Sequence, residues 1–344
     1  LDLAAGTAVS VAGGAGEDTL VGDDGDNSWV ITGLDAGTLN GGAFTDIENL
    51  QGGAGDDTFV FMPGGSITGE VRGGGGTNTL DYSAQSAAVA VDLGLGSASL
   101  TGGAHGIQNV AGGAGDDSLA GDGGANVLRG GLGADLLRGG GGADTIYGDG
   151  GEDSLSGPSG DATWLISGLD AGVVDGAGFF GVENLLGGSG RDTYALADGA
   201  GVSGLIDGGG GTNTLDFSAY TTGIVANLAI GFATRTGAVR AIQNVVGGKG
   251  RDELTGDGGD NLLDGGAGDD VLAGGGGLDL LTGGLGADTL AGPAGDATWT
   301  ITGADSGSVG GAGFRGIENL SAGAGNDNFV MAGGSVSGTV AGHH

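Results

Sequence analysis

Residues 112–165 read GGAGDDSLA GDGGANVLR GGLGADLLR GGGGADTIY GDGGEDSLS GPSGDATWL, six copies of one nine-residue pattern in a row. Residues 247–300 give six more, GGKGRDELT GDGGDNLLD GGAGDDVLA GGGGLDLLT GGLGADTLA GPAGDATWT. Single copies begin at Gly13, Gly22, Gly52, Gly73, Gly187, Gly208 and Ala322, which brings the total to 19. The sixth position is Asp in 12 copies, Asn in 5 and Ala in 2, and the eighth is a large apolar or aromatic residue in all 19. An apolar position that is never missed indicates a core-facing residue in every repeat.

A longer period contains the short one. Trp29, Trp164 and Trp299 are spaced 135 residues apart, so the chain is about two and a half copies of one 135-residue unit. The first copy lacks the equivalent of residues 127–162, a block of 36 residues or four nonapeptides. With two nonapeptides to a coil this block is two whole coils, and deletion by whole coils is what a solenoid tolerates, because each coil packs only on its neighbours.

The composition excludes several classes of protein. The chain has 91 glycines among 344 residues, 43 acidic and 9 basic side chains, a formal charge of −34, three prolines and no cysteine. Interior glycines disfavour long helices, and three prolines are too few for collagen. The absence of cysteine argues against zinc fingers and disulfide scaffolds. The negative charge argues against nucleic acid as a partner, and without a run of 18 apolar residues we expect no membrane insertion.

The nonapeptide can be understood physically as half of one coil. Glycines at positions 1, 2 and 4 permit the positive φ angles of a tight turn, and positions 7–9 form a short strand. Two nonapeptides then make a coil of 18 residues, whose strands pair in parallel with those of the next coil. Side chains 18 residues apart should stack, with Leu119, Leu137 and Leu155 in one column and Leu128 and Ile146 in the opposite column.

The pattern resembles the calcium-binding nonapeptide of RTX (repeats-in-toxin) proteins, GGxGxDxUx, where U is a large apolar residue. The resemblance implies an all-β fold, a parallel β-roll or β-helix solenoid with calcium-binding turns, interrupted here by longer irregular β coils. It also implies that each ion lies between turns one coil apart on the same edge. The residues agree with this chemistry, since carboxylate and carbonyl oxygens suit a hard cation, and irregular turns suit Ca²⁺ better than Mg²⁺.

Carried over to this sequence, the resemblance predicts metal ligands at the sixth positions. Asn keeps an oxygen ligand but loses the charge, so we expect weaker sites there, and Ala162 and Ala297 supply no ligand. The copies with Asp57, Asp192 and Asp327 have no neighbour at the 18-residue spacing, so they either bind weakly or serve only as turns. The predicted calcium ligands are Asp18, Asp57, Asp117, Asn126, Asp135, Asp144, Asp153, Asp192, Asp252, Asn261, Asp270, Asp279, Asp288 and Asp327.

Longer stretches separate the nonapeptide cassettes. We expect them to be longer coils that continue the same stack, with an inserted β-sandwich as the alternative. The eighth-position tryptophans should fill the core rather than form a sugar-binding surface, and a recurring Glu/Gln-Asn pair, as in Glu48-Asn49, should be a corner device rather than a site. The predicted segments are a partial repeat with a short cassette (1–29), longer coils (30–111), cassette 1 (112–165), longer coils (166–246), cassette 2 (247–300), a partial repeat (301–342) and a purification-tag remnant (343–344).

These features predict a calcium-stabilised structural solenoid of a secreted or cell-surface bacterial protein, such as an adhesin stalk, an extracellular filament or a surface-layer element. Without metal, crowded carboxylates and a glycine-rich backbone favour disorder, so calcium binding supplies folding free energy. We expect an extracellular location and no enzyme activity in this chain, and the RTX resemblance implies type I secretion.

Alternative functions are open. The chain can be an accessory module of a type I-secreted protease, lipase or epimerase whose catalytic domain lies outside it. Calcium-dependent ice binding needs a regular outward Thr/Asn array, and only Thr77-Asn78 and Thr212-Asn213 fit. Both chain ends lie inside the repeat, so the chain is either cut from a longer array or joins its ends head to tail into filaments.

Overall fold

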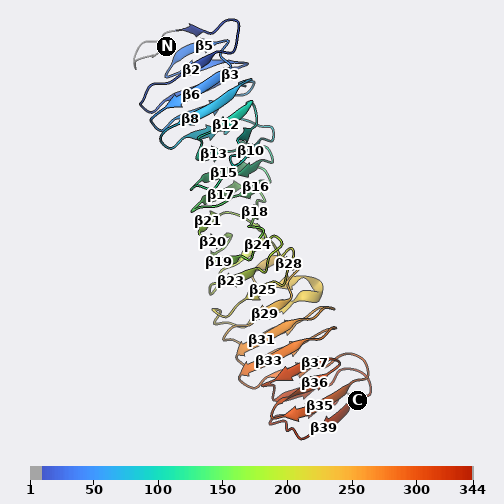
Figure 1. Ribbon diagram of the computed structural model, residues 1–344. Helices are drawn as coiled ribbons and strands as arrows, with labels where there is room; N and C mark the ends of the chain where they lie inside the picture. Colours follow the sequence, from blue (N-terminus) through green and yellow to red (C-terminus); the bar gives the residue numbers. More distant parts are fainter. Residues whose placement is uncertain (1–9, 343–344) are drawn as a thin grey trace. The chain divides into compact units, whose positions relative to one another are not determined.

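A computed structural model describes residues 10–342, which fall into two compact units. The N-terminal unit comprises the residues up to Gly157 together with Gly176–Glu183, and the C-terminal unit comprises Pro158–Asp175 together with the residues from Asn184 onward. Over the described range the chain forms 40 β-strands and one short 3-10 helix, η1 (Leu228–Ile230) (Figure 1). The predicted tag remnant and the first nine residues of the predicted 1–29 segment lie outside the described residues. No helix within residues 10–342 has the length and apolar character needed to cross a membrane.

In the N-terminal unit the chain alternates between two sets of strands. The first set is β1 (Val11–Ala12), β3 (Ser28–Gly33), β4 (Ala36–Leu39), β5 (Gly42–Thr45), β7 (Thr58–Phe61), β9 (Thr79–Asp81), β13 (Asn109–Ala111), β15 (Val127–Leu132), β17 (Thr145–Gly150) and β21 (Ala177–Phe180). The second set is β2 (Thr19–Val21), β6 (Asn49–Gly53), β8 (Glu70–Gly74), β10 (Ala90–Asp92), β11 (Ser97–Ala98), β12 (Gly103–His105), β14 (Ser118–Ala120), β16 (Leu136–Arg138) and β18 (Ser154–Ser156).

The C-terminal unit repeats this alternation. Its first set is β19 (Thr163–Gly168), β20 (Ala171–Val174), β23 (Thr193–Leu196), β25 (Thr214–Asp216), β29 (Asn244–Val246), β31 (Leu262–Ala267), β33 (Leu280–Leu285), β35 (Thr298–Gly303), β36 (Ser306–Val309), β37 (Ala312–Arg315) and β39 (Asn328–Met331). Its second set is β22 (Asn184–Leu186), β24 (Val202–Asp207), β26 (Val225–Asn227), β27 (Phe232–Ala233), β28 (Thr236–Arg240), β30 (Glu253–Thr255), β32 (Val271–Ala273), β34 (Thr289–Ala291), β38 (Asn319–Ser321) and β40 (Val340–Ala341).

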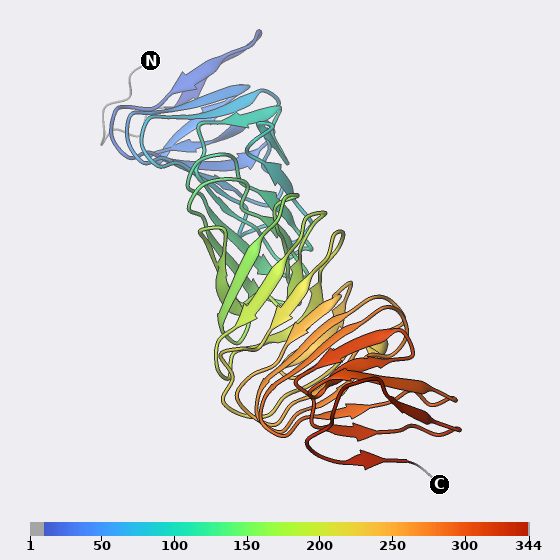
Figure 2. The same ribbon diagram turned by 60° about the horizontal axis from the view of Figure 1, so that its bottom comes forward.

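Parallel pairing between successive coils confirms the predicted columns. Leu119 of β14 lies opposite Leu137 of β16, which lies opposite Leu155 of β18. Leu128 of β15 lies opposite Ile146 of β17. All five side chains are at most 1% exposed, so each column is core. Within each unit the strands of successive coils lie one above the next, and turns at the edges join the two sets (Figure 2).

The segments outside the cassettes keep the parallel pairing but use longer coils. In the N-terminal unit Thr58 lies opposite Thr79, Thr79 opposite Asn109, and Asn109 opposite Val127. Backbone groups of these coils are bonded at sequence separations of 30 and 21 residues, against 18 within the cassettes. β23, β25, β29 and β31 repeat this order in the C-terminal unit. Parallel pairing across these segments is the arrangement that a continued stack predicts.

Antiparallel strands near the tryptophans are a feature that the repeat pattern did not predict. β3 pairs antiparallel with β4, and β4 with β5, so the chain forms a three-stranded meander whose outer strands β3 and β5 also pair in parallel with β7 and β1. β35, β36 and β37 form the same meander in the C-terminal unit. The turns of the β3–β5 meander use Asp35 (φ 51°) and Asn40 (φ 49°), short polar residues that tolerate the left-handed region.

Aromatic side chains fill the core of the longer coils. Trp29, Trp164 and Trp299 are fully buried, which confirms their predicted place in the core. Trp29 stacks on Phe59 with ring centroids 5.6 Å apart, and Trp299 stacks on Phe329 at 5.2 Å. The first five eighth-position residues of each cassette are Leu or Ile, and Trp164 and Trp299 end the cassettes, so the wider coils use larger side chains to reach close packing.

Candidate metal centre

The sixth residue of the nonapeptide is the main buried polar position of this fold. It follows the glycine turn and precedes the strand. Burying an isolated charge is costly, so each of these carboxylates needs hydrogen bonds or a counter-ion. Asp18 and Asp327 are half-buried. The buried sixth-position residues, at most 5% exposed, are Asn27, Asp57, Asn78, Asp117, Asn126, Asp135, Asp144, Asp153, Asp192, Asn213, Asp252, Asn261, Asp270, Asp279 and Asp288.

One carboxylate oxygen of each cassette Asp accepts a backbone hydrogen bond from the preceding coil. The N–H of Asp117 donates to Oδ1 of Asp135 at 2.7 Å, and the N–H of Asp135 donates to Oδ1 of Asp153 at 2.9 Å. The structure therefore joins the residues predicted on this edge into a ladder with an 18-residue step. The corresponding ladders elsewhere link Asp252, Asp270 and Asp288, Asn126 and Asp144, and Asn261 and Asp279.

The other carboxylate oxygen, Oδ2, faces a backbone carbonyl. Oδ2 of Asp270 is buried and has no hydrogen-bond partner. It lies 2.5 Å from the point that a Cβ on Gly265 would occupy, and the carbonyl oxygen of Gly283 in the next coil lies 2.6 Å from the same point. We call this space in front of the first-position glycine the position-1 cradle. When the carboxylate is ionised, two acceptor oxygens that share one space repel each other, whereas a cation binds both.

Other acidic turns share this arrangement. At Gly130 the cradle is bounded by Oδ2 of Asp135 at 2.2 Å and by the carbonyl oxygen of Gly148 at 2.7 Å. Asp117 and Asp252, which begin the two ladders, differ because Oδ2 of each accepts an N–H from its own turn. The buried Oδ2 atoms without a hydrogen-bond partner include those of Asp18, Asp57, Asp135, Asp192, Asp270 and Asp288.

The donor set fits calcium. No group of three or more Asp, Glu, His or Cys side chains within residues 10–342 is placed to hold a metal ion. Backbone carbonyls must therefore supply most of the ligands around each carboxylate. Carbonyl-rich and irregular oxygen coordination is what Ca²⁺ accepts and what Mg²⁺, with its near-ideal octahedron, does not.

Glycine has two separate roles in these turns. Several turns have positive φ at positions 2 and 4, for example 107° at Gly131 and 119° at Gly133, as the sequence predicts, but the first turn of each cassette, with Gly113 and Gly115 or Gly248 and Gly250, does not. Position 1 was predicted to need positive φ as well, and this is wrong, because Gly130 and Gly265 do not have it. A side chain at position 1 would instead fill the cradle between the carboxylate and the carbonyl.

Burial shifts the acidity of the ladder residues. Burial raises the pKa of Asp270 to about 7, and the charges of Asp252 and Asp288 add to the rise. Burial also raises the pKa of Asp135 to about 6 and that of Asp153 to about 6. The pKa values of Asp57, Asp144, Asp192, Asp252, Asp279 and Asp288 are raised for the same reason. Without a cation, the folded chain therefore resists ionisation at these positions.

The single copies are less isolated than their spacing suggests. Asp57 receives the N–H of Asn27 from 30 residues earlier, and its own N–H donates to Asn78, 21 residues later. Asp192 receives the N–H of Ala162 in the same way. Ala162 supplies no oxygen, but Asp192 keeps its own cradle at Gly187. These copies continue the ladder with a longer step.

The Asn turns satisfy both functions of their amides within the protein. In Asn126, Oδ1 accepts the N–H of Asp122 and Nδ2 donates to the carbonyl of Gln108. Asn261 makes the equivalent bonds with Asp257 and Gln243. Because the amide oxygen and nitrogen already have hydrogen-bond partners, these side chains do not require a cation. We therefore still expect weaker calcium binding at the Asn positions.

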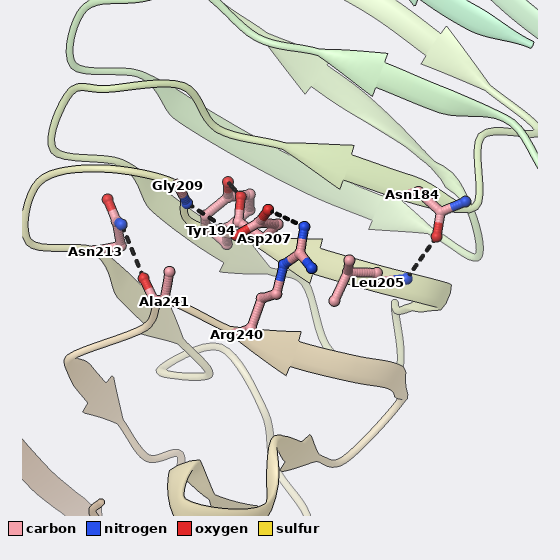
Figure 3. A network of polar contacts seen from close by, with 8 residues as sticks. All are labelled: Asn184, Tyr194, Leu205, Asp207, Gly209, Asn213, Arg240 and Ala241. Atoms are coloured by element: carbon pink, nitrogen blue, oxygen red, sulfur yellow. Dashed lines mark hydrogen bonds and ion pairs between the residues drawn. The ribbon is translucent and has the colours of Figure 1, made fainter. Parts of the chain in front are cut away.

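The ladder contains acceptors that the nonapeptide pattern did not reveal. Oε2 of Glu48 and of Glu318 accepts the N–H of Asp18 and of Asp288, at 2.8 and 2.9 Å. The recurring Glu/Gln-Asn pair was the signal in the sequence. The Asn of the pair is a corner device as predicted, for example where Oδ1 of Asn184 accepts the N–H of Leu205 (Figure 3).

Fifth-position carboxylates form a second, exposed ladder that the sequence reasoning also missed. Oδ1 of Asp116 accepts the N–H of Ala134 at 2.8 Å, and Oδ1 of Asp269 accepts the N–H of Ala287 at 2.9 Å. The acidic residues at positions 5 and 6 therefore both bond backbone groups of a neighbouring coil.

A family model for the RTX calcium-binding nonapeptide repeat matches residues 10–28, 43–60, 106–137, 129–163, 243–272 and 264–298. The chain is built on RTX calcium-binding repeats. These matches cover both cassettes to within two residues and three of the single copies, and they agree with the parallel strand pairing of a β-roll. No curated protein matches the chain. The RTX turns of this chain thus form a calcium-binding β-roll.

Proposed function

We propose that this chain is a structural element of a secreted or cell-surface bacterial protein, a β-solenoid that completes its folding on binding calcium outside the cell. The observation that carries the proposal is the position-1 cradle, where a buried Asp Oδ2 and a carbonyl oxygen share one space without a hydrogen between them. Repetition of this arrangement along the turn edges makes the fold itself dependent on cations.

The charges of the chain support a folding role for the metal. The formal charge is −34, and the ladder carboxylates of one edge follow each other at every coil. Bound calcium supplies positive charge and joins oxygens of adjacent turns. Extracellular calcium modules bind with dissociation constants of about 10⁻⁴–10⁻³ M, so such a chain can remain unfolded during export and fold outside.

The use of the acidic side chains supports a structural rather than a catalytic role. In Asp116, Asp135 and Asp153 one carboxylate oxygen accepts a hydrogen bond from a backbone N–H of a neighbouring coil. A carboxylate held in this way is a building element of the turn. We therefore propose that the chain itself has no enzyme activity, and that any self-association joins coil to coil at the ends.

A calcium titration of the full chain tests the proposal. In EDTA we expect a far-UV circular dichroism spectrum of a largely unfolded chain, and a β spectrum at millimolar or lower calcium. Magnesium at the same concentration should not produce the change. A β spectrum that is the same in excess EDTA and in calcium would contradict the proposal. Electron microscopy of the same samples tests self-association, with filaments expected only in calcium.

A further inference from the structure

Two kinds of junction connect the nonapeptide turns to the longer coils that follow them. In each, the sixth-position residue donates its N–H to a Glu or Gln about 30 residues later. The Glu or Gln follows a residue with positive φ by two positions, Gly316 (58°) before Glu318 and Ala241 (51°) before Gln243. The two junctions therefore share this turn and the same strand register, with Asn319 opposite Thr289 and Asn244 opposite Thr214, while their acidic or amide side chains differ.

In the acidic junction two hydrogen-bond acceptors, a carboxylate oxygen and a backbone carbonyl oxygen, face each other. Asp288 is fully buried and its Oδ2 has no hydrogen-bond partner. Oδ2 lies 2.5 Å, and the carbonyl oxygen of Gly316 lies 2.0 Å, from the point that a Cβ on Gly283 would occupy. The carboxylate of Glu318 is anchored beside them through its bond to the N–H of Asp288. The acidic junction thus combines two carboxylates with a backbone carbonyl, and the coil next to Asp288 presents Gly316 and Glu318 in place of an RTX turn.

In the amide junction the equivalent position holds a donor, the side-chain N–H₂ of Asn, which faces the backbone carbonyl. Nδ2 of Asn213 donates to the carbonyl oxygen of Ala241 at 2.9 Å (Figure 3) and to that of Gly210 at 2.9 Å. Its Oδ1 accepts the N–H of Asp192, as Oδ1 of Asp288 accepts that of Asp270. The amide N–H₂ therefore takes the place that a cation would take, and nothing is left unpaired.

The N-terminal unit contains both kinds of junction as well. Nδ2 of Asn78 donates to the carbonyl of Gly106, and its N–H donates to Gln108. Asp18 instead meets Glu48, and Oδ2 of Asp18 shares the cradle at Gly13 with the carbonyl of Asp46. Asp153 pairs with Glu183 through the same N–H bond at 2.8 Å. Asp always occurs with Glu and Asn always with Gln.

We infer that the calcium sites of Asp18, Asp153 and Asp288 are completed by Glu48, Glu183 and Glu318, which lie outside the nonapeptide motif, and that the Asn–Gln junctions are metal-free. This inference rests on the proposed calcium-dependent folding. The physical reason is that a pair of acidic side chains opposite a carbonyl requires a cation, whereas a pair of amides supplies its own donor.

Counting bound ions tests the inference. The D288N/E318Q variant of the full chain converts an acidic junction into the amide type that the chain already uses at Asn213 and Gln243. In saturating calcium, equilibrium dialysis followed by elemental analysis should give one ion fewer per chain than the unchanged protein, with the same β spectrum. The charge-matched control D264N/E253Q removes an outward-facing half-buried and an exposed carboxylate, and should leave the ion count unchanged.

The reverse variant keeps the test decisive if the first fails to fold. N213D/Q243E creates an acidic junction and should gain one ion per chain. The inference is overturned if the folded D288N/E318Q variant binds as many ions as the unchanged protein. If only N213D/Q243E folds, an unchanged ion count in that variant overturns it. Neither result would contradict calcium-dependent folding. Absence of bound calcium in the unchanged protein would instead overturn the proposed function.

Discussion

The turn at residues 265–270 and the turn at residues 208–213 share the nonapeptide layout and the buried sixth residue, but they solve the burial of that residue differently. Asp270 leaves Oδ2 without a hydrogen-bond partner and faces the carbonyl of Gly283. Asn213 donates from Nδ2 to two carbonyls and has no such gap. One scaffold therefore contains turns that need a cation and turns that supply their own donor.

The distribution of the two turn types divides each unit into regions with different calcium dependence. In the N-terminal unit, coils with Asn78 and Gln108 directly precede the acidic ladder of Asp117, Asp135 and Asp153. Coils whose Asn side chains donate to backbone carbonyls need no metal to keep their strand pairing. They can therefore stay folded without calcium and provide a surface on which the acidic coils fold when calcium binds. The comparison therefore predicts local differences in stability that a single folding transition would hide.

The largest expected effect is a regional difference in hydrogen exchange when calcium is removed. In EDTA, peptides from residues 130–156 should lose all protection, because no cation then joins Oδ2 of Asp135 to the carbonyl that shares its cradle. Peptides from residues 76–111 should exchange at least tenfold more slowly. Mass spectrometry of pepsin fragments measures both regions in one sample, and equal exchange in the two would break the comparison.

An intermediate effect is expected from filling one cradle. Gly130→Ala places a Cβ 2.2 Å from Oδ2 of Asp135, so it should displace the cation and lower the free energy of unfolding in calcium by about 1–3 kcal/mol. Gly141→Ala is the matched control, because its Cβ would meet only the Cα of Gly123 at 3.8 Å. Thermal unfolding in calcium measures both, and equal melting temperatures would show that the cradle has no role.

The smallest expected effect is the pH dependence of the calcium-free chain. The folded pKa values of Asp135 and Asp153 are about 6 and that of Asp270 is about 7, above the value of about 3.9 for Asp in an unfolded chain. The folded chain holds more protons between about pH 4 and 7, so its stability falls as pH rises through this window. Residual β signal in EDTA should be larger at pH 5 than at pH 7.5.

Two further measurements separate this effect from the general loss of charge at low pH. Asp270→Asn removes the carboxyl group with the most strongly raised pKa, so it should flatten the pH dependence, whereas Glu253→Gln on the exposed strand surface should not. With calcium present the sign reverses, since protons compete with the ion, and the calcium midpoint should be higher at pH 5. A midpoint that does not change with pH would argue against carboxylate ligands.

Much of the candidate site could be predicted from local pattern. The strict apolar eighth position predicts the columns through Leu119 and Leu128, and the recurring Asp predicts the ladder from Asp117 to Asp153. The longer steps could not be predicted, because the partners of Asp57 lie 30 and 21 residues away. A nine-residue repeat pattern does not predict which strands of the stack pair with the outer strands of a three-stranded meander.

The sequence by itself determined the calcium chemistry, the RTX repeat and the stacked coil, because each follows from residues within one nonapeptide or exactly two nonapeptides apart. Only the tertiary structure decided which groups meet across coils of unequal length. It brought Glu318 to Asp288 and Gln243 to Asn213, and it placed a carbonyl opposite each side chain. Whether a turn needs a cation depends on whether the side chain can donate a hydrogen bond to the carbonyl opposite it. The side chain and the carbonyl come from different coils, so only the stacked structure decides this.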